Sequence, residues 1–223
     1  MKSKYSILAA ACLLLSISGA YAEIPTKEVV ANAYVHSPEA AAAALTASEY
    51  TWFGLDFTYL KIFGDSGFKE APTPLPAGWN ELILNEQKKY DAVKTFGKKP
   101  VAYDFEPVAK RNKGINLDAL IIQQEPPELT QQQIQKEVAA LETGDTAGTG
   151  IVFMMESFSK PENQGYLHVV FFDIKTKAVL ISARMSGKAG GFGKRNYWAK
   201  PVFMVMRQIS DGVYKKLVKK YAK

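Results

Sequence analysis

Cysteine and histidine are scarce in this chain. Its 223 residues include a single cysteine, Cys12, and two histidines, His36 and His168. One cysteine cannot form an intramolecular disulfide or a set of thiolate ligands, and no His-x-x-x-His pattern supports a histidine-based metal site. The sequence therefore predicts no metal site and no cofactor.

The local patterns of several enzyme classes are also absent. There is no Gly-x-Ser-x-Gly elbow, and two histidines without a further thiol give little support to a nucleophilic triad. Carboxylates are present, and Asp56, Glu106, Glu156 and Asp173 could meet in space as the acid–base pair of a glycosidase. A hydrolase acting on envelope or glycan substrates by carboxylate catalysis therefore stays open as an alternative.

Membrane-length apolar segments are lacking. The apolar run from Ile7 to Ile17 follows a positively charged start and precedes the small residues Ala20 and Ala22. This is the pattern of a secretory signal peptide, and the run is too short to span a bilayer as a helix. We expect residues 1–22 to be removed, leaving a mature chain without a transmembrane segment that is exported to the periplasm or the outside.

Cys12 suggests a different ending for the same segment. It follows three alanines, and a lipoprotein signal also cleaves before a cysteine. That signal usually has a leucine-like residue three positions upstream, and cleavage here would leave most of the apolar run on the mature chain. These two features favour export without an anchor, and a lipid-anchored envelope component stays open as a second alternative.

Acidic residues are fewer than basic ones, 22 against 28, which gives a formal charge of +6. The excess gathers near the C-terminus. Such a cluster is typical of the solvated face of a terminal helix, but it could also contact an anionic envelope surface or glycan. Nucleic acid is not an expected partner of an exported protein. The clustered residues are Lys215, Lys216, Lys219 and Lys220.

Hydrophobic patterns after residue 49 predict one α/β domain over residues 50–223, preceded by a peripheral segment over 23–49. The run from Tyr50 to Phe63 is apolar on both faces, as in a strand covered above and below. Three strand-like runs with short links follow later and indicate an antiparallel meander. They span 149–158, 166–174 and 178–185.

Helical spacing is found in three places. Apolar residues recur from Trp79 to Phe96, after Thr130 as an N-cap, and from Trp198 to Leu217. Weaker strand patterns lie near 101–105 and 120–123. We therefore expect an α/β (α+β) fold with a single mixed sheet of about five strands, an antiparallel C-terminal meander and about three main helices.

The passage SGKAGGFGKRNYWA, residues 186–199, combines four glycines with three basic residues. It is not a P-loop, because five residues instead of four separate Gly187 from the Gly193-Lys194 pair and arginine follows. The passage does not match the dinucleotide-binding fingerprint either, because the third glycine of that motif is absent. Two interpretations remain: a sharp structural corner anchored in the core by Phe192, Tyr197 and Trp198, or a binding site for an anion.

The anion interpretation has specific residues. Asn196 could cap the following helix, whose free N–H groups favour an anion, and Lys188, Lys194 and Arg195 add positive charge. Asp56 lies within the apolar strand, where an ionised carboxylate needs a partner, such as a helix N-terminus or Arg195. The candidate ligand-binding residues are therefore Lys188, Lys194, Arg195, Asn196 and Asp56, although each also has an ordinary structural role open to it.

The passage VVFFDIKTKAVLISARMSGKAGGFGKRNYWA resembles a family of small exported proteins from Bacteroidetes-type bacteria, which share a GGFGxRNYWA corner before the final helix. The resemblance extends from Tyr166 to about Met206, and more loosely to GLDFTYLKIFG. It implies export and domain extent, and no activity. The element order is also similar to envelope domains such as the TolB N-terminal domain.

Together these patterns predict an exported, non-enzymatic binding or interaction domain. Its partner would be an envelope protein, a glycan or an anionic ligand. Its expected binding surface is the glycine-rich corner beside Asp56.

Overall fold

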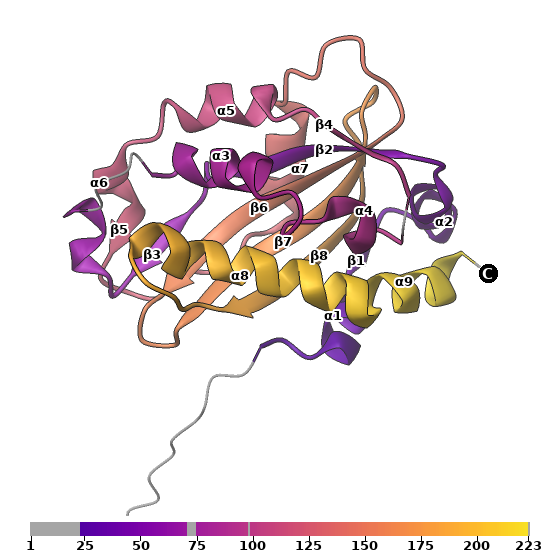
Figure 1. Cartoon of the computed structure of the whole chain (residues 1–223). Coiled ribbons are helices and arrows are strands. Elements are labelled where there is room, and N and C mark those ends of the chain that lie inside the picture. Colours follow the sequence, from indigo (N-terminus) through magenta and orange to yellow (C-terminus); the bar gives the residue numbers. More distant parts are fainter. Residues whose placement is uncertain (1–22, 71–74, 98, 223) are drawn as a thin grey trace, which may run out of the picture.

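The computed structural model describes residues 23–70, 75–97 and 99–222, so the expected signal peptide and Cys12 lie outside the described residues. The chain forms one mixed sheet of eight strands with helices on both faces (Figure 1). The elements are α1 (Thr26–Asn32), β1 (Tyr34–Val35), α2 (Pro38–Thr46), β2 (Tyr50–Asp56), β3 (Lys61–Phe63), a 3₁₀ turn (Ser66–Glu70), α3 (Ala77–Asn85), α4 (Ala92–Thr95), β4 (Val101–Tyr103), α5 (Glu106–Asn112), α6 (Leu117–Leu120), β5 (Ile121–Ile122), α7 (Gln131–Ala139), β6 (Thr149–Ser159), β7 (Gln164–Asp173), β8 (Val179–Lys188), α8 (Lys194–Gln208), a π-helical segment (Ile209–Val213) and α9 (Tyr214–Tyr221).

The sheet has the order β1-β8-β7-β6-β2-β4. β6, β7 and β8 form an antiparallel meander, and β1 adds an antiparallel edge to β8. β2 and β3 both pair with β6 in parallel, one after the other along its length. On their other sides, β2 pairs with β4 and β3 pairs with β5, again in parallel. β2 is apolar on both sides because it is buried within this mixed region.

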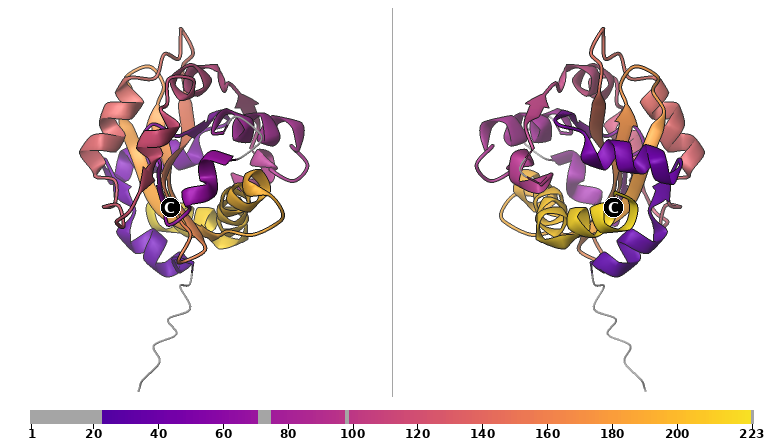
Figure 2. Two further views of the ribbon diagram at one scale, coloured as in Figure 1. Left: turned by 90° about the vertical axis from the view of Figure 1, so that its left-hand side faces the viewer. Right: turned by 90° about the vertical axis from the view of Figure 1, so that its right-hand side faces the viewer.

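The two faces of the meander are covered by different helices. Gly165 and Gly187 are direct partners on β7 and β8, and a Cβ on Gly187 would lie 2.3 Å from the carbonyl oxygen of Pro201 in α8. The glycines therefore let the backbone of α8 rest on the sheet. Figure 2 shows α7 on the opposite side of the sheet. We call the α8 side the front face and the α7 side the back face.

The expectation of about five strands and about three main helices is wrong, although the chain is an α+β fold. The run from Tyr50 to Phe63 is not one strand. A turn in which the N–H of Leu60 donates to the carbonyl of Phe57 (3.0 Å) divides it into β2 and β3. β1 and β5 have two residues each, too few for a periodic pattern.

The helices are also more numerous and shorter than expected. The expected helix from Trp79 to Phe96 is two helices, α3 and α4, separated by a turn. The charged stretch around Lys110, outside the three expected helices, belongs mostly to α5, whose few buried residues include Pro107 and Val108. Short surface helices of this kind carry little apolar periodicity.

Predictions that rest on strong local patterns are confirmed. The three strand-like runs are β6, β7 and β8, paired as a meander. Thr130 caps α7 and forms a capping box with Gln133. The long apolar stripe after Trp198 is α8, continued through the π-helical segment into α9.

Residues 23–49, expected to be peripheral, supply α1, β1 and α2. They add a strand to the same sheet and pack against it. The residues that they bury in the core are Val29, Ala41, Ala44 and Leu45.

Candidate functional site

The glycine-rich corner joins β8 to α8. Gly190, Gly191 and Gly193 have φ values of 156°, 116° and 76°, which residues with side chains rarely adopt. Gly193 is the N-cap of α8 and has no side-chain cap bond. The prediction that Asn196 caps the helix is wrong, because α8 already begins at Lys194.

Pro201 lies in the interior of α8. Proline has no N–H, so the carbonyl of Tyr197, four residues earlier, loses its helical donor. The N–H of Gly190 donates to that carbonyl instead, at 3.1 Å. The corner thus closes back on the helix that it begins, and its glycines have an architectural role.

Of the three aromatic residues expected to anchor the corner in the core, two pack against the protein and one does not. Trp198 is fully buried and stacks on Phe158, with ring centroids 4.6 Å apart. Tyr197 is half-buried against Trp198. Phe192 is 95% exposed, so the expectation that it anchors the corner in the core is wrong.

The corner contains a buried carboxylate, but this is Asp65 and not Asp56. Asp65, in the loop after β3, pairs with the ammonium of Lys194 and accepts a hydrogen bond from the indole of Trp198 at 3.1 Å. The indole of Trp79 donates to the backbone carbonyl of Arg195 at 2.8 Å, which also holds the start of α8 in place. Lys188 and Arg195 have exposed side chains.

Asp56 has the partner that burial demands, but its partner is Arg111 and not Arg195. The Nε of Arg111 in α5 lies 3.4 Å from one carboxylate oxygen, and the N–H of Thr58 donates to the other at 2.9 Å. Arg111 also pairs with Glu137 of α7. Among the described residues, no hydrogen bond or ion pair joins Asp56 to Lys188, Lys194, Arg195 or Asn196.

The C-terminal lysines occupy the solvated side of α9. They lie at the other end of the α8–α9 rod from the glycine-rich corner (Figure 1). The two basic regions are therefore separate, and contact of these lysines with an anionic surface stays a prediction. The exposed residues are Lys215, Lys216, Lys219 and Lys220.

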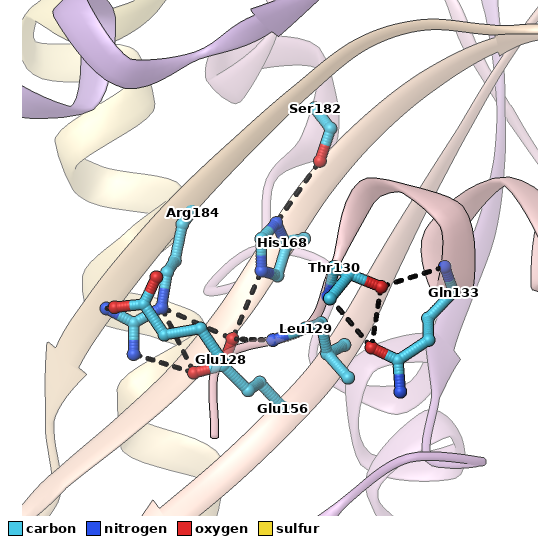
Figure 3. Close-up of polar contacts among 8 residues, drawn as sticks. All are labelled: Glu128, Leu129, Thr130, Gln133, Glu156, His168, Ser182 and Arg184. Carbon is cyan, nitrogen blue, oxygen red and sulfur yellow. Dashed lines mark hydrogen bonds and ion pairs between the residues drawn. The ribbon is translucent and has the colours of Figure 1, made fainter. Parts of the chain in front are cut away.

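A second group of polar side chains lies on the back face of the meander (Figure 3). Each of the three strands contributes one ionisable residue within an apolar run: Glu156 on β6, His168 on β7 and Arg184 on β8. Glu156 is 2% and His168 is 7% exposed. His168 and Arg184 are direct cross-strand partners, and Glu156 sits where a register shift adds a residue to β6.

The contacts among these side chains are specific. Arg184 donates to both carboxylate oxygens of Glu156, with Nη2–Oε1 and Nε–Oε2 distances of 2.7 and 3.2 Å. His168 contacts Glu156 through Nε2 at 3.1 Å and the Ser182 hydroxyl through Nδ1 at 3.2 Å. The guanidinium of Arg184 stacks on the ring of Tyr166, 4.6 Å from its centroid.

The N-terminus of α7 binds the same group. The N–H of Leu129 donates to Glu156 at 3.0 Å, and the carboxylate of Glu128 lies 3.0 Å from Nη1 of Arg184. The capping box of Thr130 and Gln133 fixes the start of the helix directly after these contacts. Arg184 is therefore held between a buried carboxylate and a mostly exposed one.

Opposing effects act on the Glu156 carboxyl. Burial alone raises its pKa, but hydrogen bonds from His168 and Arg184 and the charge of Arg184 outweigh burial and lower the pKa to about 2. Glu156 is therefore a permanent anion near neutral pH. The same ion pair raises the pKa of Arg184, although burial opposes the rise.

A cavity of about 240 Å³ opens above this group, between α1, β1 and the start of α7. Ile24, Val29, Leu129 and Ile134 supply apolar parts of its wall, and polar or charged side chains line the rest, among them His168, Ser182 and Arg184 from the meander. Glu28 and Glu128 are acidic lining residues and Glu156 lies beneath, so acidic groups outnumber the one guanidinium. The lining is Ile24, Glu28, Val29, Asn32, Tyr34, Glu128, Leu129, Gln131, Ile134, His168, Ser182 and Arg184. We call this site the back-face cavity.

The four carboxylates that could have formed a hydrolytic pair have different partners. Within the described ranges, none of their hydrogen bonds or ion pairs joins one of the four to another. The contacts are Asp56 with Arg111, Glu106 with Lys110 at 3.5 Å, Asp173 with the N–H of Thr176 at 2.6 Å, and Glu156 with Arg184.

The sequence does contain a pattern that points to the back-face cavity, although it is clear only when three strands are compared. Glu156, His168 and Arg184 each interrupt an apolar strand, and the three strands are consecutive. A single histidine within a strand is typical of a packed or edge residue, and Glu156 stands out only as one of several carboxylates. Their proximity depends on the hairpin register and on the extra residue at Glu156, which the pattern does not specify.

Within residues 23–70, 75–97 and 99–222, no cluster of three acidic, histidine or cysteine side chains could hold a metal ion. No helix in the same ranges combines the length and apolarity needed to span a membrane. These findings concern only the described part of the chain.

No protein-family model matches the sequence, and no curated protein matches it. A solved structure of a hypothetical protein from Chlamydia trachomatis is similar, with 10% identity and a TM-score of 0.33 over 78% of this chain and 98% of that one. A likeness this weak supports no conclusion about fold or function. The resemblance to small exported proteins of Bacteroidetes-type bacteria therefore stays a prediction.

Proposed function

We propose that this protein is an exported, non-enzymatic binding domain and that its ligand occupies the back-face cavity. The ligand class that fits is a small molecule carrying a protonated amine. The observation that carries the proposal is that two buried polar side chains, His168 and Ser182, line a cavity with mixed polar and apolar walls, and that His168 contacts the buried Glu156 carboxylate beneath it at 3.1 Å.

The charge of the site favours a cation. Arg184 is already neutralised by Glu156 and Glu128. Glu28, which lines the cavity from α1, takes part in no ion pair among the described residues. An ammonium group between Glu28 and Glu128 would therefore find uncompensated negative charge, whereas an anion of equal size would be repelled. The volume of about 240 Å³ suits a small amine rather than a peptide.

The state of the carboxylates supports binding over carboxylate hydrolysis. A general acid for glycoside cleavage needs a raised pKa so that it holds a proton near neutral pH. The pKa of Glu156 is lowered to about 2, and Glu128 is largely exposed and paired with Arg184. Glu156 and Glu128 are therefore suited to binding as fixed negative charges and not to donating a proton.

Isothermal titration calorimetry with putrescine and with succinate tests the ligand class. The diamine should bind and the dicarboxylate of similar size should not. Glu128→Gln should weaken putrescine binding about fivefold, the effect of one exposed ion pair worth roughly 1 kcal/mol. Glu142→Gln is the matched control, because its side chain is 81% exposed and lies outside the cavity.

Equal affinity for the two ligands, or no binding of either, would contradict the proposed site. Loss of binding in Glu142→Gln would show that putrescine attaches to the general surface. The part of the proposal that concerns export has its own test, the mass of the mature N-terminus. A chain beginning at Glu23 supports export without an anchor, and an acylated Cys12 supports the lipid-anchored alternative.

A further inference from the structure

Phe192 is the most exposed large apolar side chain among the described residues. It is 95% exposed, whereas the others in this class, Tyr34, Leu84 and Val93, are 37–41% exposed. Single exposed apolar residues are common on protein surfaces and by themselves indicate nothing. Two further features of its surroundings distinguish Phe192.

The first feature is a braced loop. In the Phe192 loop, Ala189–Gly193, the N–H of Ala189 donates to the carbonyl of Asn163 at 2.7 Å and the N–H of Gly190 donates to Tyr197 at 3.1 Å. Lys194, directly after the loop, pairs with buried Asp65. Phe192 itself stands between Gly191 and Gly193, which have no side chains to cover it. The fold thus holds this ring out into solvent.

The second feature is a set of cations around the loop. Lys188, Lys194 and Arg195 flank it in the sequence. Lys200 approaches within 3.2 Å of the position that a Cβ on Gly190 would occupy, and Lys160 stacks on the ring of Tyr197 at 3.7 Å.

Acidic groups nearby compensate only part of this charge. Asp65 is buried and pairs with Lys194, and Glu162 accepts a hydrogen bond from Tyr166. Glu23 accepts hydrogen bonds from Gln208 and from the N–H of Lys188. The five cations therefore exceed the three acidic groups, and the surface around Phe192 is basic.

We propose that the Phe192 loop docks on a bilayer that contains anionic phospholipids. Phe192 enters the boundary between headgroups and acyl chains, and the two exposed flanking cations, Lys188 and Arg195, contact lipid phosphates. An apolar tip surrounded by basic residues is complementary to such a surface in both hydrophobicity and charge. The contact is weak and reversible, because one ring and a few cations supply less affinity than an acyl chain with a polybasic patch.

Flotation with lipid vesicles tests the docking. The purified protein should float with vesicles of phosphatidylcholine mixed with phosphatidylglycerol, but not with phosphatidylcholine alone, and added salt should release it. Phe192→Ser should lower the partition coefficient at least about tenfold. Lys188→Ala combined with Arg195→Ala should lower it about 25-fold, since each cation near the surface contributes roughly fivefold.

Matched controls locate the effect. Val93→Ser removes another exposed apolar side chain, and Lys215→Ala combined with Lys216→Ala removes two cations at the far end of the α8–α9 rod; both should bind as the original chain does. Phe192→Trp provides a direct probe, because Trp52, Trp79 and Trp198 are buried. Brominated acyl chains should quench its fluorescence if the ring enters the bilayer.

Three results would overturn the proposal. They are no binding to the mixed vesicles at low salt, unchanged binding of Phe192→Ser, and loss of binding in the C-terminal lysine control, which would assign the contact with an anionic surface to the C-terminal lysines instead. All variants share one N-terminus, so a lipid at Cys12 would affect them equally. None of these results bears on putrescine binding in the back-face cavity.

Discussion

The back-face cavity lies on the side of the meander opposite α8, whereas the Phe192 loop lies at the end of β8, where the chain enters α8. The two regions differ in shape, charge and exposure. The cavity is concave and acidic, and it places ionisable groups where water is scarce. The loop is convex and basic, and it places an aromatic ring in full contact with water. Unpaired buried charges are far more costly than one exposed ring, so cavity residues must contribute to folding while Phe192 is free to serve binding alone.

The largest expected contrast comes from Glu156→Ala. This change leaves Arg184 and His168 beside an empty space in the sheet, and removing one partner of a buried ion pair typically costs about 3–5 kcal/mol. Denaturant unfolding should show a loss of this size. Glu142→Ala, at an exposed position, should change the free energy of unfolding by less than about 0.5 kcal/mol. A loss below about 1 kcal/mol for Glu156→Ala would mean that Arg184 escapes to solvent.

The ion pair between Glu156 and Arg184 should also make the free energy of unfolding depend on pH in acid. The pKa of Glu156 is lowered from 4.5 to about 2, so its contribution is complete above about pH 4.5 and is lost as the pH falls towards 2. The shift corresponds to about 3 kcal/mol. Arg184 and His168 contact the Glu156 carboxylate, and Glu128 and Tyr166 contact Arg184.

The free energy of unfolding measured against pH should therefore fall less steeply for Glu156→Gln than for the original chain in that range. Phe192→Ser should keep the original slope. Parallel curves for the original chain and Glu156→Gln would show that the Glu156 carboxylate has an ordinary pKa.

Gly187→Ala should disturb the front face. The added Cβ would lie 2.3 Å from the backbone oxygen of Pro201, and a backbone atom cannot move aside as a flexible side chain can. We expect a loss of about 1–3 kcal/mol, as for other overpacked sites, together with a changed environment of Trp198. Denaturant unfolding followed by tryptophan fluorescence measures both.

Gly114→Ala is the control for Gly187→Ala. Its nearest neighbour to a new Cβ is 3.6 Å away, and its backbone is not left-handed. Equal effects of the two substitutions would contradict close packing of α8 on β7 and β8.

The two regions also differ in how far the sequence predicts them. The meander and α7 are predictable because three apolar strand-like runs with short links, and the Thr130 cap, are local signals. The glycine-rich corner is predictable as a turn into a helix for the same reason. The cavity is not, because Glu156, His168 and Arg184 meet only through the register of three strands and one extra residue in β6.

Phe192 and Asp56 show the limit of arguing from residue type. An aromatic ring in a glycine-rich stretch was expected to anchor the corner, but glycines with positive φ turn it outwards. A buried carboxylate was correctly expected to need a partner. The identity of that partner, Arg111, depends on how α5 packs on β2, which no local pattern specifies.

The smallest expected effect completes the contrast. Phe192→Ser should leave the free energy of unfolding within about 0.5 kcal/mol of the original value, because a ring that is 95% exposed loses almost no burial when it is removed. Thermal and denaturant unfolding measure this, with the Glu156 variants for comparison. A loss above about 1 kcal/mol would mean that the ring packs against the protein in solution, and Phe192 could not then be both a folding residue and a free docking group. An unchanged stability with weakened vesicle binding would instead separate the two roles at a single side chain.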